Sequence, residues 1–209
     1  MPKALSAFGY NTLVQPIISS ANLITGLTLA GAAGTSGQVL TSAGSGLPTW
    51  STAAGFTLGT PVNASGTSVT FTGIPAGTKQ IVMTFSEVRI ADNWRIQLGN
   101  SGGIETSSYV SNSATISSGG TTALNTATDG FVGTRFNSVS YSGAITCTLL
   151  NASTFLWTAS GTVGSVTGDT PVTMISGSKA LSAVLTQIRL TTITGTASFT
   201  TGSLNIAYV

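Results

Sequence analysis

The chain has 209 residues, a length that suits one folded domain with an appendage rather than two full domains. Only 6% of its residues are charged, and the seven basic and five acidic side chains give a net charge of +2 without forming a basic cluster. Nucleic-acid binding needs such a cluster and is therefore not expected. Membrane insertion is not expected either, because no apolar run approaches the roughly 18 residues of a membrane span.

The absence of histidine removes Ser–His and Cys–His nucleophilic pairs and most zinc sites. Catalysis by a pair of carboxylates remains possible without histidine. We interpret the acidic residues as structural or solvated side chains and not as such a catalytic pair. Glu87 and Arg89 share a strand face and are candidates for an ion pair, and no Asp-rich calcium loop is present. We therefore expect no enzyme activity, no cofactor and no metal site. The carboxylates considered are Glu87, Asp92, Glu105, Asp129 and Asp169.

Residues 1–33 are apolar but aperiodic, and Pro16 and Gly26 interrupt any long helix. Disordered tails are normally poor in large apolar residues, so we predict an extended arm that is buried against a partner; a partly disordered tail is the alternative. Polar residues interrupt any signal-peptide core, so we expect cytoplasmic assembly. The predicted docking residues are Leu13, Val14, Ile17, Ile18, Leu23, Ile24, Leu27 and Leu29.

Residues 34–55 form a connector. From Gly34 to Trp50 it is rich in Gly and Ser, carries an isolated Val39-Leu40 pair and ends in Pro-Thr-Trp. This stretch resembles the connector that precedes the globular head in many tailed-bacteriophage fibre and spike proteins. The resemblance implies a virion structural protein, a homotrimer whose amino-terminal residues attach to other virion proteins while a β-rich head projects outward. In tail fibres the head contacts a host-surface glycan or protein, whereas in head fibres and decoration proteins it reinforces the capsid.

Residues 56–209 alternate between apolar and polar side chains, which predicts about nine or ten strands in an antiparallel β-sandwich, with a jelly roll as the leading topology. The composition agrees, because Thr, Ser and Gly are abundant while helix-forming Glu and Lys are scarce. The alternation in residues 68–72 and 80–85, with a turn between them, predicts a hairpin. Residues 111–128 are predicted to form a surface loop or a pair of weak edge strands. Cys147 is predicted to be a buried structural thiol, because Ile145 and Leu149 lie on the same strand face.

Further strands are predicted at residues 94–98, 138–141, 145–150, 155–159, 172–175, 184–190, 199–201 and 204–208. Sugar recognition would need an exposed aromatic ring beside polar side chains. The weak candidates for a glycan contact are Asp92, Asn93, Trp94 and Tyr109. The alternative interpretation of Trp94 is that it is the first inward-facing residue of its strand, and Trp157 is likewise assigned to the core.

The expected function is a non-enzymatic bacteriophage virion protein, a short fibre or spike for host-surface attachment. A long-reach tail fibre is not favoured, because the chain has neither a Gly-X-Y repeat nor heptads from which to build a stalk. The first alternative is a capsid-surface decoration protein or head fibre. The second is a stand-alone carbohydrate-binding or adhesin module.

Overall fold

The computed structural model describes residues 28–29, 32–45, 47–53, 55–90, 92–135, 139–165, 167–168 and 170–209, with the backbone alone for residues 28, 29, 32 and 33. The chain divides into two compact units, residues 1–54 and residues 55–209. The docking residues predicted between Leu13 and Leu27 lie outside the described residues. Leu29 lies in a described strand, but its side chain is not described.

The first unit contains two short antiparallel pairs of strands. β1 (Thr28–Leu29) pairs with β2 (Ala32–Ala33), and β3 (Gln38–Thr41) pairs with β4 (Thr49–Thr52). In the second pair Leu40 is opposite Trp50, whose indole lies over Gly34 so closely that a Cβ there would be 2.6 Å from Trp50 Cδ2. Part of the expected connector is therefore a β-hairpin.

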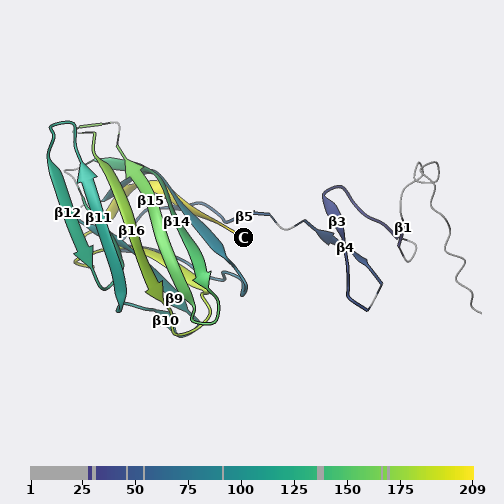
Figure 1. Ribbon diagram of the computed structural model, residues 1–209. Helices are drawn as coiled ribbons and strands as arrows, with labels where there is room; N and C mark the ends of the chain where they lie inside the picture. The colour runs from purple at the N-terminus through teal and green to yellow at the C-terminus, as the bar shows by residue number, and fades with distance from the viewer. Residues whose placement is uncertain are drawn as a thin grey trace, which may run out of the picture. The chain divides into compact units, whose positions relative to one another are not determined.

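The second unit is built from two antiparallel sheets (Figure 1). The strands of the large sheet run in the order β12-β11-β16-β15-β14-β8-β18-β5, with β6 also paired to β18. They are β5 (Thr57–Leu58), β6 (Val62–Asn63), β8 (Gln80–Ile90), β11 (Tyr109–Ile116), β12 (Thr122–Ala127), β14 (Ser140–Asn151), β15 (Leu156–Gly164), β16 (Val172–Ala180) and β18 (Phe199–Tyr208).

The small sheet has the order β10-β9-β17-β7, with β13 also paired to β9. Its strands are β7 (Ser68–Phe71), β9 (Trp94–Asn100), β10 (Gly103–Ile104), β13 (Phe131–Gly133) and β17 (Gln187–Thr192). Strand β8 lies beside β18 in the large sheet. In the small sheet β9, which follows β8 in the sequence, lies beside β17, which precedes β18. Two consecutive strand pairs thus pass from sheet to sheet together, as in a jelly roll. The predicted antiparallel β-sandwich is confirmed.

The hairpin expected between residues 68–72 and 80–85 is wrong. β7 pairs with β17 in the small sheet, whereas β8 pairs with β14 and β18 in the large sheet. The intervening loop crosses between the sheets, and buried Ile74 holds it there by donating its backbone N–H to the carbonyl of Thr186 at 3.0 Å. A Gly- and Pro-containing loop suits a hairpin turn and a change of sheet equally well, so the local sequence does not distinguish them.

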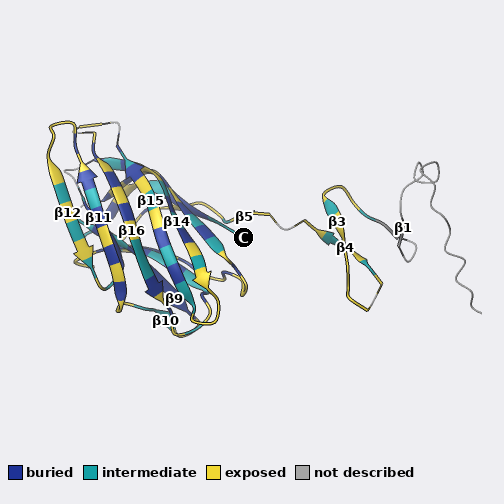
Figure 2. Cartoon of the chain, in the orientation of Figure 1, coloured by how far each residue is buried: buried dark blue, intermediate teal, exposed yellow. Residues whose placement is uncertain are grey.

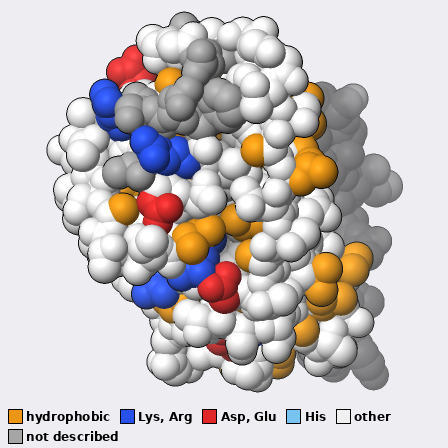
Figure 3. All heavy atoms as spheres, turned by 90° about the vertical axis from the view of Figure 1, so that its left-hand side faces the viewer, with side chains coloured by type: hydrophobic (Ala, Val, Ile, Leu, Met, Phe, Trp, Pro, Cys, Tyr) orange, Lys and Arg blue, Asp and Glu red, His pale blue; other side chains and the backbone are white. Residues whose placement is uncertain are grey.

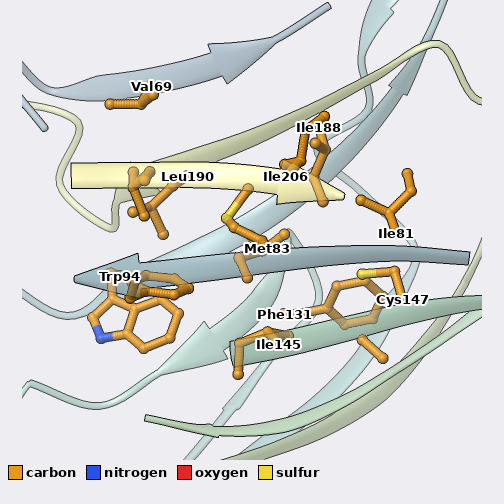
Figure 4. Close-up of a cluster of buried hydrophobic side chains, with 14 of the residues drawn as sticks. Val69, Ile81, Met83, Trp94, Phe131, Ile145, Cys147, Ile188, Leu190 and Ile206 are labelled. Atoms are coloured by element: carbon orange, nitrogen blue, oxygen red, sulfur yellow. The ribbon is translucent and has the colours of Figure 1, made fainter. Parts of the chain in front are cut away.

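The apolar core lies between the two sheets. Inward residues alternate with outward ones along the strands, so buried and exposed positions alternate in Figure 2. Figure 4 shows the central cluster, where Ile81 and Met83 of β8 meet Ile188 and Leu190 of β17. Burial of these side chains from both sheets is the main stabilising contribution, at about 2 kcal/mol for each fully buried large side chain.

Beneath β11 the buried surface is made of hydroxyl groups. Residues 111–128, expected as a loop or weak edge strands, form the β11–β12 hairpin, and β12 is the edge strand. The inward side chains of β11 include Ser113, which bonds to Thr134 at 3.0 Å, and Thr115, which bonds to Thr173 at 2.8 Å. Each buried hydroxyl thereby has a partner, which offsets its cost of desolvation.

Two long strands of the large sheet contain bulges near a glycine. β14 and β18 each combine two of the predicted segments. The register shifts near Gly143 in β14 and near Gly202 in β18, and both shifts lie opposite the same part of β8. There Glu87 takes φ +52°, a left-handed conformation that is strained for a residue other than glycine. The bulges let the long strands bend without ending.

Candidate functional site

The two aromatic residues among the glycan candidates are buried. Trp94 is 0% exposed and Tyr109 is 2% exposed, so neither ring offers a face to a sugar. Trp94 packs against Phe85, and Tyr109 packs edge-on against Phe131 with ring centres 5.1 Å apart. The assignment of Trp94 and Trp157 to the core is confirmed, and stacking of a sugar on Trp94 or Tyr109 is ruled out as these rings are placed.

The polar pair beside Trp94 is used to hold the backbone. Asp92 accepts hydrogen bonds from the backbone N–H groups of Asn93 and Thr194, at 2.7 and 3.0 Å. Asn93 accepts one from the backbone N–H of Arg135 at 2.7 Å. Burial acts to raise the pKa of Asp92, but the hydrogen bonds from Thr194 and Asn93 outweigh it and hold the pKa below its ordinary value. The candidate set therefore does not form one exposed site.

The acidic residues lie in separate parts of the sandwich. Asp129 forms an ion pair with Arg95, and Glu105 forms one with Lys179. The expected pair of Glu87 and Arg89 is not among the ion pairs of the described residues. Asp169 lies outside the described residues. Within the described part of the chain, no three His, Cys, Asp or Glu side chains gather where they could hold a metal ion.

Cys147 is a buried structural thiol, as predicted. It is fully buried on β14, where its register partners are Ala159 of β15 and Ile81 of β8. Burial raises the pKa of the thiol to about 12, so the reactive thiolate is scarce at neutral pH.

Two hollows among the described residues are candidate ligand sites. One, of about 130 Å³, is lined mainly by apolar side chains that include Leu149, Phe155 and Trp157. The other, of about 70 Å³, lies at the β8 bulge and is lined by Glu87 together with small polar residues. Both are well below the roughly 300 Å³ at which pockets for drug-sized ligands begin. They fit at most a fragment of a ligand.

The outward face of the large sheet carries no charge along β11, β12, β14, β15 and β16. The only charged residue in these five strands is Lys179, which points inward and is 3% exposed. Seen from the β12 side, most of the surface is made of uncharged polar side chains and backbone, with several Lys, Arg, Asp and Glu groups and apolar side chains among them (Figure 3). Natural sheets often carry charged side chains at exposed edges to prevent association, and the edge strand β12 of this face has none. This face lacks that protection.

One end of the uncharged face carries an apolar patch, which we define as Ala114, Ile116, Leu124, Val172 and Met174. Ile116 is opposite Val172, and Ala114 lies between Met174 on β16 and Leu124 on β12. Leu124, on the edge strand, is 79% exposed. A contiguous exposed patch that is rimmed by polar residues is typical of an interaction surface.

A partly buried polar network joins the two sheets at the turn between β9 and β10. Glu105 follows β10 directly, and its Oε2 lies 2.6 Å from Nζ of Lys179 on β16. Its Oε1 accepts hydrogen bonds from Nδ2 of Asn100 at 2.8 Å, and from the backbone N–H and hydroxyl of Ser182. Nζ also lies 5.3 Å from the ring centre of Tyr109. One carboxylate therefore contacts an amine and a carboxamide.

The sequence did not predict this network: Glu105 was interpreted only as a structural or solvated carboxylate, and Lys179 was not singled out. A signal was present. Alternate residues of a strand lie on the same face, so Lys179 lies on the same face of β16 as buried Thr173 and Ile175. Extending the predicted strand at 172–175 to residue 179 therefore places a lysine on the inward face. Lysine is rarely buried unless it is paired, so a buried acceptor was to be expected.

Comparison of the chain with protein-family models, with curated proteins and with solved structures gives no match. No helix among the described residues is long and apolar enough to cross a membrane.

Proposed function

We propose that this chain is a non-enzymatic structural protein of a bacteriophage particle, a short fibre or spike. Residues 1–33 would attach it to other virion proteins, and the β-sandwich of residues 56–209 would project outward as the head domain. The observation that carries the proposal is the uncharged outward face of the large sheet, which suits burial against other protein chains. The resemblance of the Gly34–Trp50 connector to those of phage fibres adds support.

The partner proposed for the uncharged face is another copy of the same chain, in a homotrimer. A partner that placed a charge against this face would lose the hydration of that charge without gaining an opposite charge. In a trimer, one part of this face would pack against a different part of the same face on the neighbouring copy, so only hydroxyl and apolar groups would be buried. The open edge of β12 adds unpaired backbone groups, and Leu124 adds apolar surface beside it.

Host attachment is the proposed role of the head, and capsid decoration or a head fibre is the alternative. Burial of Trp94 and Tyr109 removes the aromatic part of the expected glycan site, which weakens the argument for a sugar receptor in particular. A stand-alone adhesin module is the further alternative. Such a module would have no use for a self-associating face, so the uncharged face favours the assembled protein.

The test is to locate the protein on particles of the phage that carries its gene. Antibodies against residues 55–209 are applied to purified particles and their positions are recorded by immunogold electron microscopy. Label at the tail or baseplate supports a fibre or spike, and label over the capsid supports the decoration alternative. Particles without label would overturn the virion proposal.

A parallel measurement separates attachment from the other roles. The purified full chain is examined by light scattering and on an array of bacterial surface glycans. A trimer with host-surface binding supports an attachment fibre, and a trimer without binding supports decoration. A monomer that binds glycans supports the adhesin module and contradicts the proposed assembly.

A further inference from the structure

We propose that the side chains of Lys179 and Asn100 become joined by an amide bond, which the folded chain forms by itself with Glu105 transferring the protons. The bond would be a modification within one molecule, formed once per chain. It requires no partner, and its test does not depend on the proposed phage function.

The three side chains are assembled around one carboxylate. Oε2 of Glu105 lies 2.6 Å from Nζ of Lys179, and Oε1 lies 2.8 Å from Nδ2 of Asn100. The amine and the carboxamide therefore occupy the two oxygens of the same acid. Lys179 is 3% exposed and Asn100 is 7% exposed, so water has little access to either group.

The Asn100 carboxamide is polarised in the direction that the reaction needs. Its Oδ1 accepts a hydrogen bond from the backbone N–H of Gly102 at 2.7 Å, and its Nδ2 faces Glu105. A backbone N–H on the carbonyl oxygen stabilises the negative charge that develops there during attack on the carbon. An acid beside the amide nitrogen can protonate it as it leaves.

The reaction exchanges one amine for another at Cγ of Asn100. A proton passes from Nζ of Lys179 to Glu105, which leaves a neutral amine and a neutral carboxylic acid. The lone pair of Nζ forms the new C–N bond, and the bond from Cγ to Nδ2 breaks. Of the two protons that Nζ loses, one goes through Glu105 to the departing nitrogen, which leaves as ammonia. The other stays on Glu105 or leaves with ammonia as ammonium. No oxidant, metal or cofactor is needed.

The starting state is the ion pair. Burial acts to raise the pKa of Glu105, but Lys179 and the hydrogen bonds from Ser182 outweigh it and hold the pKa below its ordinary value. The proton transfer that starts the reaction takes place within this contact and does not change the total charge. The fold holds both reacting groups against the same carboxylate, so they gain the advantage of an intramolecular reaction. This advantage compensates for the small population of the neutral pair.

The bond would link the two sheets covalently. Asn100 ends β9 in the small sheet, whereas Lys179 lies on β16 in the large sheet. The side-chain contacts between the sheets would then be supplemented by a cross-link in a chain that has only one cysteine and therefore no internal disulfide. Such a link resists separation of the sheets under force or heat.

The experiment is intact-mass spectrometry of the purified full chain, followed by peptide mapping. We expect a mass lower than that of the sequence by one ammonia, and a branched peptide in which Lys179 is joined to Asn100. The full mass in the folded, aged protein would overturn the proposal. Because this readout uses the unaltered chain, it does not depend on any variant folding.

Variants then assign the loss of ammonia. Lys179→Arg, Asn100→Ala and Glu105→Gln should each have the full mass of their own sequence, whereas Lys79→Arg, at an exposed lysine, should still lose ammonia. Asparagine can also lose ammonia by closing a ring with the next backbone nitrogen. A loss that persists in Lys179→Arg would therefore identify that ring and overturn the proposed bond.

Discussion

The indole of Trp94 occupies the space beside Gly133 that a side chain would need. The two residues are register partners on β9 and β13, and a Cβ at Gly133 would lie 2.2 Å from Cε2 of Trp94. Trp94 cannot move aside easily, because it is fully buried and its ring centre lies 5.4 Å from that of Phe85. Glycine is therefore required at position 133 by packing and not by its backbone conformation.

We expect Gly133→Ala to destabilise the sandwich by about 3 kcal/mol, since overpacking a rigid core forces strands or side chains to shift. The measurement is the free energy of unfolding from a urea titration followed by tryptophan fluorescence. Gly119→Ala is the matched control, because its Cβ would meet only Ser117 Oγ at 4.0 Å. Equal stability of the two variants would contradict the packing argument.

Cys147 should not react with thiol reagents in the native protein. Its side chain is fully buried, so a reagent cannot reach the sulfur. Burial also raises the pKa of the thiol to about 12, so very little of the reactive thiolate is present at pH 8. We expect full labelling in denaturant and almost none without it, measured with a chromogenic disulfide reagent. Cys147→Ser should lose about 1–3 kcal/mol of stability, because its hydroxyl would be buried among apolar neighbours. Cys147→Ala, which buries no polar group, is the control.

The lowered pKa of Asp92 predicts a loss of stability in acid. Because the carboxylate is favoured in the folded state by Thr194 and Asn93, its contribution is present above the ordinary pKa of about 4 and is lost as pH falls through the lower, folded-state value. Asp92→Asn should remove this part of the pH dependence and cost about 1 kcal/mol at pH 7. Unfolding free energies from pH 2 to 7 measure both. An unchanged slope between wild type and variant would contradict the assignment.

A charge on the uncharged face should disrupt self-association. Met174 belongs to the apolar patch, and Met174→Lys would bury an unpaired ammonium group if that patch is an interface. We expect the oligomer to dissociate to monomers at micromolar concentration, measured by light scattering. Ser68→Lys, at an exposed position on β7 of the small sheet, is the control and should leave the oligomer intact. If Met174→Lys also leaves it intact, the copies associate through another surface.

The strands themselves could be predicted because alternate burial produces a local pattern. Trp94, Ile96 and Leu98 are all fully buried, as their spacing predicts. The ends of strands were less accurate. Separate segments were predicted on either side of Gly143 and of Gly202, yet each pair of segments belongs to one long strand, because cross-strand hydrogen bonds on either side keep the strand continuous through a bulge.

Pairing between strands could not be predicted in the same way. Residues 68–71 alternate in a manner that suits β8 or β17 equally, and the choice of β17 depends on which sheet buries Val69 and Phe71. The network of Asn100, Glu105 and Lys179 could not be predicted for the same reason, because it also depends on contacts between distant residues. Its members lie up to 79 residues apart by number, from 100 to 179, and only the packing of β16 over the turn after β9 brings them together.

The sequence by itself determined that this is a sparsely charged all-β sandwich with a buried thiol, because composition and a two-residue period act through local geometry. The tertiary structure decided which strands are neighbours and which side of each sheet faces water. It thereby buried the aromatic rings that had been candidates for sugar contact, grouped exposed apolar side chains into one patch and placed a lysine, a glutamate and an asparagine in contact. These outcomes depend on contacts between distant residues, whose energies no local pattern records.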